Sequence, residues 1–347
     1  MAPRGPLAPG ALGAPDAPVI PGAPIALSCG EPAGIGPEIA VAAWEALRGE
    51  DVIFLIGDPA HLPRGSAFVE IAAPEEAAAA MPRGLPVLAR DFGAPRVPGV
   101  ARPEHAPHVI GAIAEAVALV QAGRAAALCT APIHKKALQD GAGFAFPGHT
   151  EYLAHLAGGR EVAMMLACDA LRVVPATIHI PLEEVPRALT PARLESCIRV
   201  TEAGLRAQGL ARPRIAVAGL NPHAGEGGAM GTEERDWIAP LIEHLAGEGM
   251  AITGPHPADT MFHPPARARY DVAIAMYHDQ ALIPIKTLDF AGGMNVTLGL
   301  GFVRTSPDHG TAFDIAGQGV ADASSLIAAL RMAREMADET SGGVSGG

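Results

Sequence analysis

Short apolar runs that alternate with longer helical patterns constrain the fold of this chain more than any other feature. The runs have the length of strands, and most are followed by a stretch with helical periodicity. Strands that alternate with helices form a mainly parallel sheet with helices on both faces. The sequence therefore predicts an α/β fold. The predicted strands are 25–28, 52–56, 126–130, 162–168, 172–179, 215–218 and 272–276. The predicted helices are 37–47, 108–121, 191–208, 233–246 and 323–336.

The length and one local pattern predict more than one domain. A chain of 347 residues is long enough for about two domains of roughly 150 residues each. The runs 162–168 and 172–179 are separated by three residues, which predicts a hairpin and a second domain with some antiparallel character. Residues 1–23 are rich in Pro and Gly and are predicted to be a disordered leader, and 339–347 a flexible tail.

Composition and charge exclude some classes of function. Hydrophobic residues make up 49% of the chain and charged residues 18%, so a large buried core is possible. The net charge of −12 argues against a protein that binds nucleic acid. The chain has no apolar run of 18 residues, so no membrane span is expected. The four cysteines form no CxxC pair and are typical of the reduced thiols of a cytoplasmic protein.

Three histidines lie in separate segments that do not resemble ordinary core. They are His179 in ATIHIP, His223 in LNPHAGEGG and His278 in AMYHDQALIPIK, each within or just past an apolar run. Ligands bind at the carboxyl ends of strands in open α/β sheets. Three imidazoles that converge there would make a divalent-metal site with room for a substrate. Asp279 could orient its neighbour His278, and an all-histidine set leaves the identity of the metal open.

Two loops are candidates for anion binding. GEPAGIG joins a predicted strand to a helix, where backbone amides can hold an anion, although its spacing is neither GxGxxG nor a Walker A loop. FPGHTEYLA places His149 and Thr150 at the start of a helix, with Thr150 as its predicted N-cap. A histidine, a hydroxyl and free amides at a helix start suit a phosphate.

Downstream, Lys286, Asn295 and Arg304 interrupt an otherwise apolar stretch. Arg304 suits forked contact with a phosphate or carboxylate, and Lys286 can act as a point charge. Asp308 and His309 resemble a piece of a hydrolase triad, but the chain has no nucleophile elbow.

At this point the chain resembles the 4-hydroxythreonine-4-phosphate dehydrogenase family of vitamin B6 synthesis. The resemblance covers residues 30 to 317, and its motifs occur in family order. The motifs are GEPAGIGPEIA, CTAPIHKKAL, FPGHTEYLA, ATIHIPL, LNPHAGEGGAMGTEE, GPHPADTMF, YHDQALIPIK and NVTLGLGFVRTSPDHGTAFDIAG.

The resemblance implies a two-domain α/β/α sandwich of the isocitrate/isopropylmalate dehydrogenase type. The first domain would comprise 24–140 with 285–338, and the second 141–284. It also implies a homodimer, with each active site in the interdomain cleft at the dimer interface. The metal ligands would be His179, His223 and His278. The substrate contacts would be His149, Thr150, Lys286, Asn295 and Arg304.

The implied reaction is the metal-dependent oxidation of 4-phosphooxy-L-threonine by NAD or NADP. The product would be a 3-keto acid that decarboxylates to 3-amino-2-oxopropyl phosphate, in pyridoxal 5'-phosphate synthesis. Zn, Mg, Co and Mn remain open as the metal. Lys286, Asp259 and a metal-bound water remain open as proton acceptors, and no cofactor-binding residue is assigned.

Three alternatives remain at this stage. A relative of the family could oxidise erythronate or threonate 4-phosphate, or a dihydrodiol carboxylate, with the same ligands. A metal-dependent hydrolase could use the three histidines, although no carboxylate set for a second metal is evident. A non-catalytic metal or phosphate binder would bind ligand without turnover.

Overall fold

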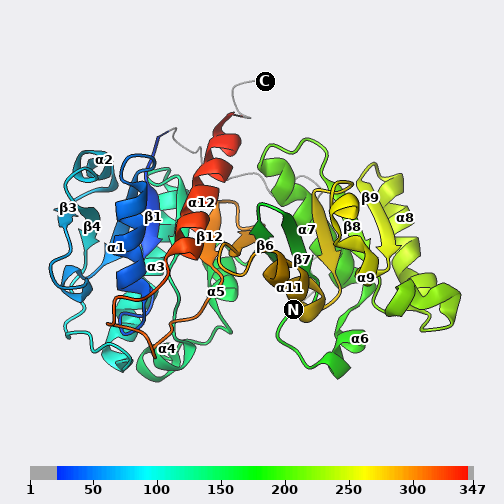
Figure 1. The fold of residues 1–347 in the computed structure, drawn as a ribbon, viewed down its shortest axis with the longest axis horizontal. Coiled ribbons are helices and arrows are strands. Elements are labelled where there is room, and N and C mark those ends of the chain that lie inside the picture. The colour runs from blue at the N-terminus through cyan, green and yellow to red at the C-terminus, as the bar shows by residue number, and fades with distance from the viewer. Residues whose placement is uncertain (1–21, 343–347) are drawn as a thin grey trace.

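One continuous sheet organises the molecule. The computed structural model describes residues 22–342, and within them twelve strands form a single sheet (Figure 1). In their order across the sheet, the strands are β3 (Phe68–Ile71), β4 (Leu85–Ala89), β2 (Ile53–Gly57), β1 (Ile25–Ser28), β5 (Ala127–Thr130), β12 (Arg304–Pro307), β11 (Met294–Leu298), β6 (Ala163–Cys168), β7 (Leu171–Pro175), β10 (Val272–Ala275), β8 (Arg214–Ala218) and β9 (Ala251–His256).

Strand direction divides the sheet into two parallel halves with an antiparallel centre. The strands from β3 to β12 run parallel, and so do β7, β10, β8 and β9. Between them, β11 is antiparallel to both β12 and β6, and β6 is antiparallel to β7. The predicted α/β class and the β6–β7 hairpin are confirmed. We call β3 to β12 in this order the first half, and β6 to β9 the second half.

Helices flank the sheet. In Figure 1, α1 and α12 lie side by side over the first half, while α8 packs beside β9 in the second. The α-helices are α1 (Gly36–Leu47), α2 (Ala77–Ala80), α3 (Ala106–Gln121), α4 (Lys135–Ala142), α5 (His149–Leu156), α6 (Val185–Ala188), α7 (Pro191–Ala207), α8 (Ala239–Gly247), α9 (Ala258–Met261), α10 (Pro264–Arg267), α11 (His278–Leu288) and α12 (Ser324–Gly342). The short helical segments are η1 (Pro59–His61), η2 (Pro74–Glu76), η3 (Pro103–His105), η4 (Leu182–Glu184), η5 (Pro222–Gly228) and η6 (Glu234–Ile238).

The core follows from the apolar pattern. All four residues of β1 are buried, as expected for a central parallel strand covered on both faces. The inward face of α1 buries Ile39, Ala43 and Leu47 at helical spacing. None of the helices in the described range has the length and apolar character needed to cross a membrane.

The chain returns to the first half at its end. Strands β11 and β12 lie between β5 and β6, although they come last among the strands in the sequence. Because Arg304 and Thr305 pair with Leu128 and Cys129, the last strand completes the parallel half begun by β1. Hydrogen bonding continues across the whole sheet, so the proposed division into two domains stays a prediction.

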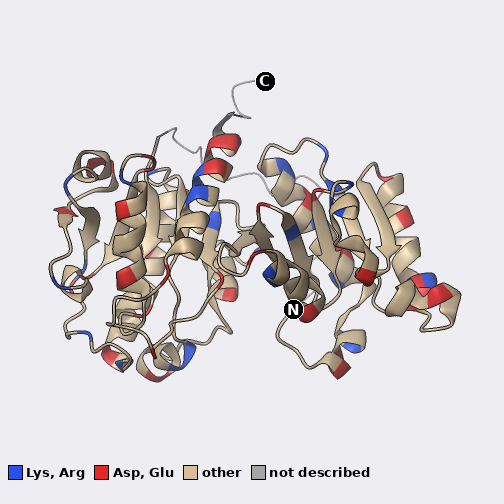
Figure 2. Ribbon diagram, viewed as in Figure 1, with Lys and Arg blue, Asp and Glu red and all other residues tan. Residues whose placement is uncertain are grey.

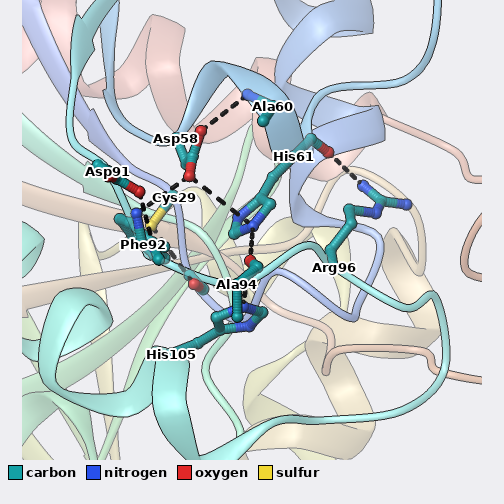
Figure 3. Close-up of polar contacts among 11 residues, drawn as sticks. Cys29, Asp58, Ala60, His61, Asp91, Phe92, Ala94, Arg96 and His105 are labelled. Carbon is teal, nitrogen blue, oxygen red and sulfur yellow. Dashed lines mark hydrogen bonds and ion pairs between the residues drawn. The ribbon is translucent and has the colours of Figure 1, made fainter.

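A polar cluster in the first half holds the segment after β4 (Figure 3). Nε2 of His61 and Nε2 of His105 lie 2.9 and 2.8 Å from the carbonyl oxygen of Ala94. Since a carbonyl only accepts, both rings carry their hydrogen on Nε2. Arg96 donates to the carbonyl of His61 at 2.8 Å, and Asp58 accepts from the backbone of Ala60 at 2.8 Å. Burial lowers the pKa of His61, which keeps the ring neutral.

Most predicted elements are confirmed within a few residues, with three differences. Strand β7 ends at Pro175, so His179 lies in the loop beyond it rather than at its end. Helix α5 begins at His149 with Gly148 as N-cap, so the prediction that Thr150 caps it is wrong. Helix α12 continues to Gly342, into the predicted tail, while the predicted leader falls almost wholly outside the described residues.

Candidate active site

Two of the three predicted metal ligands lie together in the second half. The ring centroids of His179 and His278 are 5.6 Å apart. Thr177 fixes this arrangement, because its hydroxyl donates to the carbonyl of Met276 at 2.7 Å and so joins the loop after β7 to the end of β10. The pair opens into a cavity of about 290 Å³. Its lining residues are Thr177, Ile178, His179, Ile180, Leu182, Val185, Tyr277, His278 and Asp279.

The spacing of this pair fits a shared divalent ion. Imidazole nitrogens bind such ions at about 2.0–2.1 Å, so two ligating rings at a tetrahedral angle have centroids about 5 Å apart. Nδ1 of His278 lies 2.8 Å from Oδ1 of Asp279. An ionised carboxylate only accepts, so Nδ1 carries the hydrogen and Nε2 is left with a lone pair for a metal.

Both histidine loops have unusual backbones. His179 has a φ of 54°, a left-handed conformation that residues other than Gly rarely adopt. His223 begins a run of five left-handed residues that ends at Gly227, with φ values from 42° to 77°. Each non-Gly residue held in this conformation costs roughly 1–2 kcal/mol. Such strain persists only when surrounding contacts enforce it, and it concentrates at functional sites.

Two carboxylates, one of them buried, hold the His223 loop. Glu234 is 4% exposed, and its Oε1 accepts the backbone N–H of Asn221 at 2.7 Å. The side-chain amide of Asn221 donates to Glu233 at 2.7 Å and to Glu234 at 3.0 Å. These bonds fix the turn that follows β8 and leave His223 exposed.

The third predicted ligand does not complete the site within one chain. Among residues 22–342, no three His, Cys, Asp or Glu side chains are grouped closely enough to hold a metal ion. Gln280 joins the segment after β10 to the segment after β8. Its side chain accepts from Met276 N at 2.7 Å and donates to the carbonyl of Gly219 at 2.9 Å. The three-histidine site therefore stays a prediction, and the single chain assembles His179 and His278.

A buried cation lies at the centre of the sheet. Arg304, the first residue of β12, is 2% exposed. Its guanidinium donates to the hydroxyls of Thr297 at 2.9 Å and Thr130 at 2.6 Å, and its Nε has no partner. Burial lowers the pKa of Arg304 to about 10, so the group stays charged at neutral pH. No ion pair to Arg304 is present in the described part of the chain, which leaves its charge available for an anion.

Two more predicted substrate contacts have buried polar atoms without partners. Nε2 of His149 and Oδ1 of Asn295 are both in this state. Buried polar groups in proteins are nearly always hydrogen-bonded, so exceptions call for a missing partner. Burial, followed by the nearby charges of Arg304 and Lys135, lowers the pKa of His149 well below its ordinary value. His149 and Arg304 therefore belong to one electrostatic cluster, ready to receive a polar ligand.

The remaining predicted residues differ in their surroundings. Lys286 forms an ion pair with Asp308 at 2.5 Å and donates to its carbonyl at 3.2 Å. The hydroxyl of Thr150 makes no capping bond at the start of α5. Asp259 is exposed in α9, which packs against η5, the segment that carries His223.

The structure adds residues that sequence reasoning missed. Lys135 is close enough to His149 and His179 to lower the pKa of both, after the larger effect of burial. Glu151 also acts on His179, in the opposite direction. Lys135 and Glu151 lie in α4 and α5, so the charges of these helices reach the histidine pair. The motif CTAPIHKKAL contained Lys135, but one lysine of two adjacent ones carried no signal of its own.

Charge is otherwise distributed evenly. Figure 2 shows Lys and Arg interspersed with Asp and Glu over the helices of both halves. The basic face expected of a nucleic-acid binder is not visible in this view.

Comparisons with known proteins identify the family of this chain. Residues 50–333 match the family model described as pyridoxal phosphate biosynthetic protein PdxA. The 4-hydroxythreonine-4-phosphate dehydrogenase of Roseobacter denitrificans is 65% identical over 317 residues, which cover 91% of this chain and 97% of that protein. A crystal structure of 4-hydroxythreonine-4-phosphate dehydrogenase from Klebsiella pneumoniae superposes with a TM-score of 0.83 at 40% identity, covering 90% and 99% of the two chains.

A more distant structure has a different named substrate. The terephthalate 1,2-cis-dihydrodiol dehydrogenase of Burkholderia xenovorans superposes with a TM-score of 0.63 at 28% identity, covering 90% of this chain and 97% of that one. The fold is thus shared by dehydrogenases with different substrates.

Proposed function

This chain belongs to the PdxA family of pyridoxal phosphate biosynthetic proteins and is a dehydrogenase, and from this premise we propose that it oxidises 4-hydroxythreonine 4-phosphate. The reaction removes a hydride from the alcohol carbon to NAD or NADP and a proton from the hydroxyl. The resulting 3-keto acid loses carbon dioxide to give 3-amino-2-oxopropyl phosphate. The four free thiols suit a cytoplasmic enzyme.

The observation that carries this proposal is the set of unpartnered buried atoms around Arg304. Nε of Arg304 and Nε2 of His149 lie in one electrostatic cluster, and Oδ1 of Asn295, on the strand next to that of Arg304, adds an unpartnered acceptor. A substrate with phosphate, carboxylate, amine and hydroxyl groups can meet all three. Water-excluded charges of this kind bind an anion more strongly than charges on the surface.

The histidine pair would hold the divalent metal. His179 and His278 would supply ring nitrogens, with Asp279 fixing the ring of His278. A divalent ion bound there would lower the pKa of the substrate hydroxyl and would polarise the carbonyl that forms from it. Lowered pKa values keep imidazoles neutral and able to ligate, and partial burial, followed by the charge of Lys135, lowers the pKa of His179.

The protein's own groups bind and orient the substrate. We assign Arg304 and the start of α5 to its anionic groups, and Asn295 to a donor such as the amine. Lys286 already pairs with Asp308. This ion pair favours Lys286 as a positive charge that binds the substrate over Lys286 as the proton acceptor. Asp259 and a metal-bound water remain as candidates for the acceptor.

We further propose that the working form is a homodimer in which a second copy supplies the third ligand. Exposed apolar side chains occur on the elements that carry or adjoin the histidine pair: Leu182 in η4 lines its cavity, while Ile283 lies within α11 and Phe290 just beyond the end of that helix. Phe290 is 80% exposed, which is unusual for a side chain that gains about 2 kcal/mol on burial. A symmetric partner would cover this surface and could bring its own His223 to the pair.

Mixed dimers test the shared site. His179→Ala and His223→Ala are each expected to inactivate a homodimer. If ligands come from two subunits, a mixture that exchanges subunits contains dimers with one intact site and regains activity. No recovery in a mixture shown to have exchanged would mean that each chain supplies all its ligands.

The reaction itself is tested by NAD(P)H absorbance. The purified protein is assayed with NAD or NADP, a divalent metal and 4-hydroxythreonine 4-phosphate. Turnover that requires the nucleotide, the metal and the substrate supports the proposal. Turnover at full rate after the metal has been chelated would show that the reaction needs no metal. The Burkholderia neighbour favours a dihydrodiol carboxylate as the second candidate, and erythronate and threonate 4-phosphates complete the panel. Phosphate-ester hydrolysis without nucleotide would favour a hydrolase.

A further inference from the structure

We propose that Lys135 is a binding residue for the substrate's phosphate, acting together with the start of α5. This inference rests on the proposed function, because it names a further contact in the same site. It concerns a residue outside the predicted substrate set of His149, Thr150, Lys286, Asn295 and Arg304.

The position of Lys135 places its ammonium at the start of α5. A Cβ atom built on Gly148 would lie 3.6 Å from the Lys135 Nζ and 3.5 Å from its Cε. Gly148 is the N-cap of the eight-residue helix α5, and no side chain caps it. The first backbone N–H groups of a helix are free to bind an anion, and the helix dipole favours negative charge there. Lys135 therefore adds a full charge where the backbone offers donors.

An independent observation points to a ligand at the same place. The first residue of α5 is His149, whose Nε2 is buried and has no hydrogen-bond partner. Lys135 and Arg304 both act electrostatically on this ring. A phosphate at the start of α5 would accept from His149 and from the Lys135 ammonium.

The charges of the site require such a cation. A phosphate monoester carries about −1.5 to −2 charges at neutral pH. Lys286 is already neutralised by Asp308 at 2.5 Å, so Arg304 alone would face this charge. Lys135 is exposed, and no ion pair to it is present among residues 22–342. The nearest carboxylate at the helix start is that of Glu151, whose Oε2 would lie 3.3 Å from the same Cβ position. When Lys135 is counted, the site has two cations, Lys135 and Arg304, against the one carboxylate of Glu151. A positive charge therefore remains for the phosphate.

The next residue provides a matched control. Lys136 has the same side chain, but it pairs with Asp140 at 2.9 Å and is 76% exposed. Its ammonium is held on the solvent side of α4. Replacement of Lys136 changes the net charge as replacement of Lys135 does, without changing the proposed contact.

The test compares Lys135→Met, Lys135→Arg and Lys136→Met in the full-length protein. Binding of inorganic phosphate is measured by calorimetry, and KM and kcat are measured with the phosphorylated substrate. A charge-assisted hydrogen bond supports a loss of about 10- to 100-fold in phosphate affinity and a similar rise in KM for Lys135→Met, with little change in kcat. Lys135→Arg keeps part of the affinity, and Lys136→Met matches the unmodified protein. Melting temperatures confirm that the variants fold.

Other results would overturn the inference. Equal phosphate affinity in Lys135→Met and Lys136→Met would show that Lys135 makes no specific contact with the phosphate. A fall in kcat with unchanged KM and phosphate affinity would move Lys135 to the reacting atoms. If phosphate binding depends on Lys135 while the protein does not oxidise 4-hydroxythreonine 4-phosphate, the anion site stands and the proposed substrate fails.

Discussion

Around Arg304, the central strands bury a cation and its polar neighbours, whereas the loops after β7 and β8 expose histidines on a left-handed backbone. Arg304 is 2% exposed and sits in regular β12, while His179 and His223 are exposed and have φ values above 50°. The Arg304 region is destabilised by the desolvation of a buried charge, and the histidine loops are destabilised by backbone strain.

The difference shows how two kinds of ligand are received. A buried cation held by two threonine hydroxyls is in place before an anion arrives, so binding needs little reorganisation. The exposed histidines are poised by local contacts, but they form no three-ligand group without a further component. The contacts that hold Arg304 all come from one chain, whereas the histidine region is proposed to need a metal and a partner.

The largest expected effect comes from removing the buried cation. Arg304→Met should lower kcat/KM about 100-fold or more, because a charge-assisted contact to the substrate is lost. The melting temperature should not fall, since an apolar side chain of similar length avoids the desolvation of the guanidinium. Steady-state kinetics and thermal unfolding check the two parts. A large loss of both stability and activity would make Arg304 a structural residue instead.

The second effect probes the exposed histidines. His278→Ala should remove the metal-induced rise in melting temperature, and Asp279→Asn should weaken metal affinity about 10- to 100-fold, as loss of an orienting carboxylate does. Metal titration with a thermal readout measures both. Unaltered metal affinity in His278→Ala would show that the pair of His179 and His278 does not bind the metal. Without added metal, both variants should unfold like the parent protein, because neither side chain belongs to the hydrophobic core.

A matched pair of substitutions measures the strain in the His223 loop. Gly225→Ala should destabilise the protein by about 2 kcal/mol, because a left-handed φ of 77° excludes a side chain and its Cβ would lie 2.6 Å from Glu234 Oε2. Ala224→Gly should stabilise it by about 0.5–1 kcal/mol, since it relieves a φ of 52°. Denaturant unfolding gives both values. Equal signs for the two variants would mean that the loop relaxes to another backbone.

The smallest effect is the pH dependence set by His149. Its pKa is lowered in the folded state from 6.5, so the unfolded chain binds the proton more readily. Its contribution to stability is therefore present above pH 6.5 and is lost as the pH falls below it, by up to about 1.4 kcal/mol per unit. His149→Gln should flatten the stability curve below pH 6.5, with the slope from His61 remaining. An unchanged slope would show that His149 is protonated in the folded protein.

Local patterns predicted much of the fold. Strand β1 was predicted with its observed bounds, and most of the major helices within three residues. Helix α11 was missed because Pro284 lies within it, and β11 and β12 because the glycines around them resemble loop. The strand order could not be predicted, since the insertion of β12 beside β5 joins residues far apart in sequence.

The site was predicted less completely. The histidines and Arg304 were identified by residue type and resemblance. The local sequence pattern does not show which buried polar side chains lack a hydrogen-bond partner in the folded protein. The positions of Lys135 and Gln280 depend on segments packing across the sheet. Whether His223 joins the pair is proposed to depend on a second copy of the chain.

The late return of β12 has a consequence for how the polypeptide is made. Strands β6 to β10 lie between residues 163 and 275, so nearly all of the second half can pair before the ribosome has finished. Strand β5 must wait with an open edge until Arg304–Pro307 emerges, and open edges recruit other chains. The centre of the sheet is thus completed last, because β6 also waits for β11, and a nascent chain stalled before β11 would expose two unpaired strand edges.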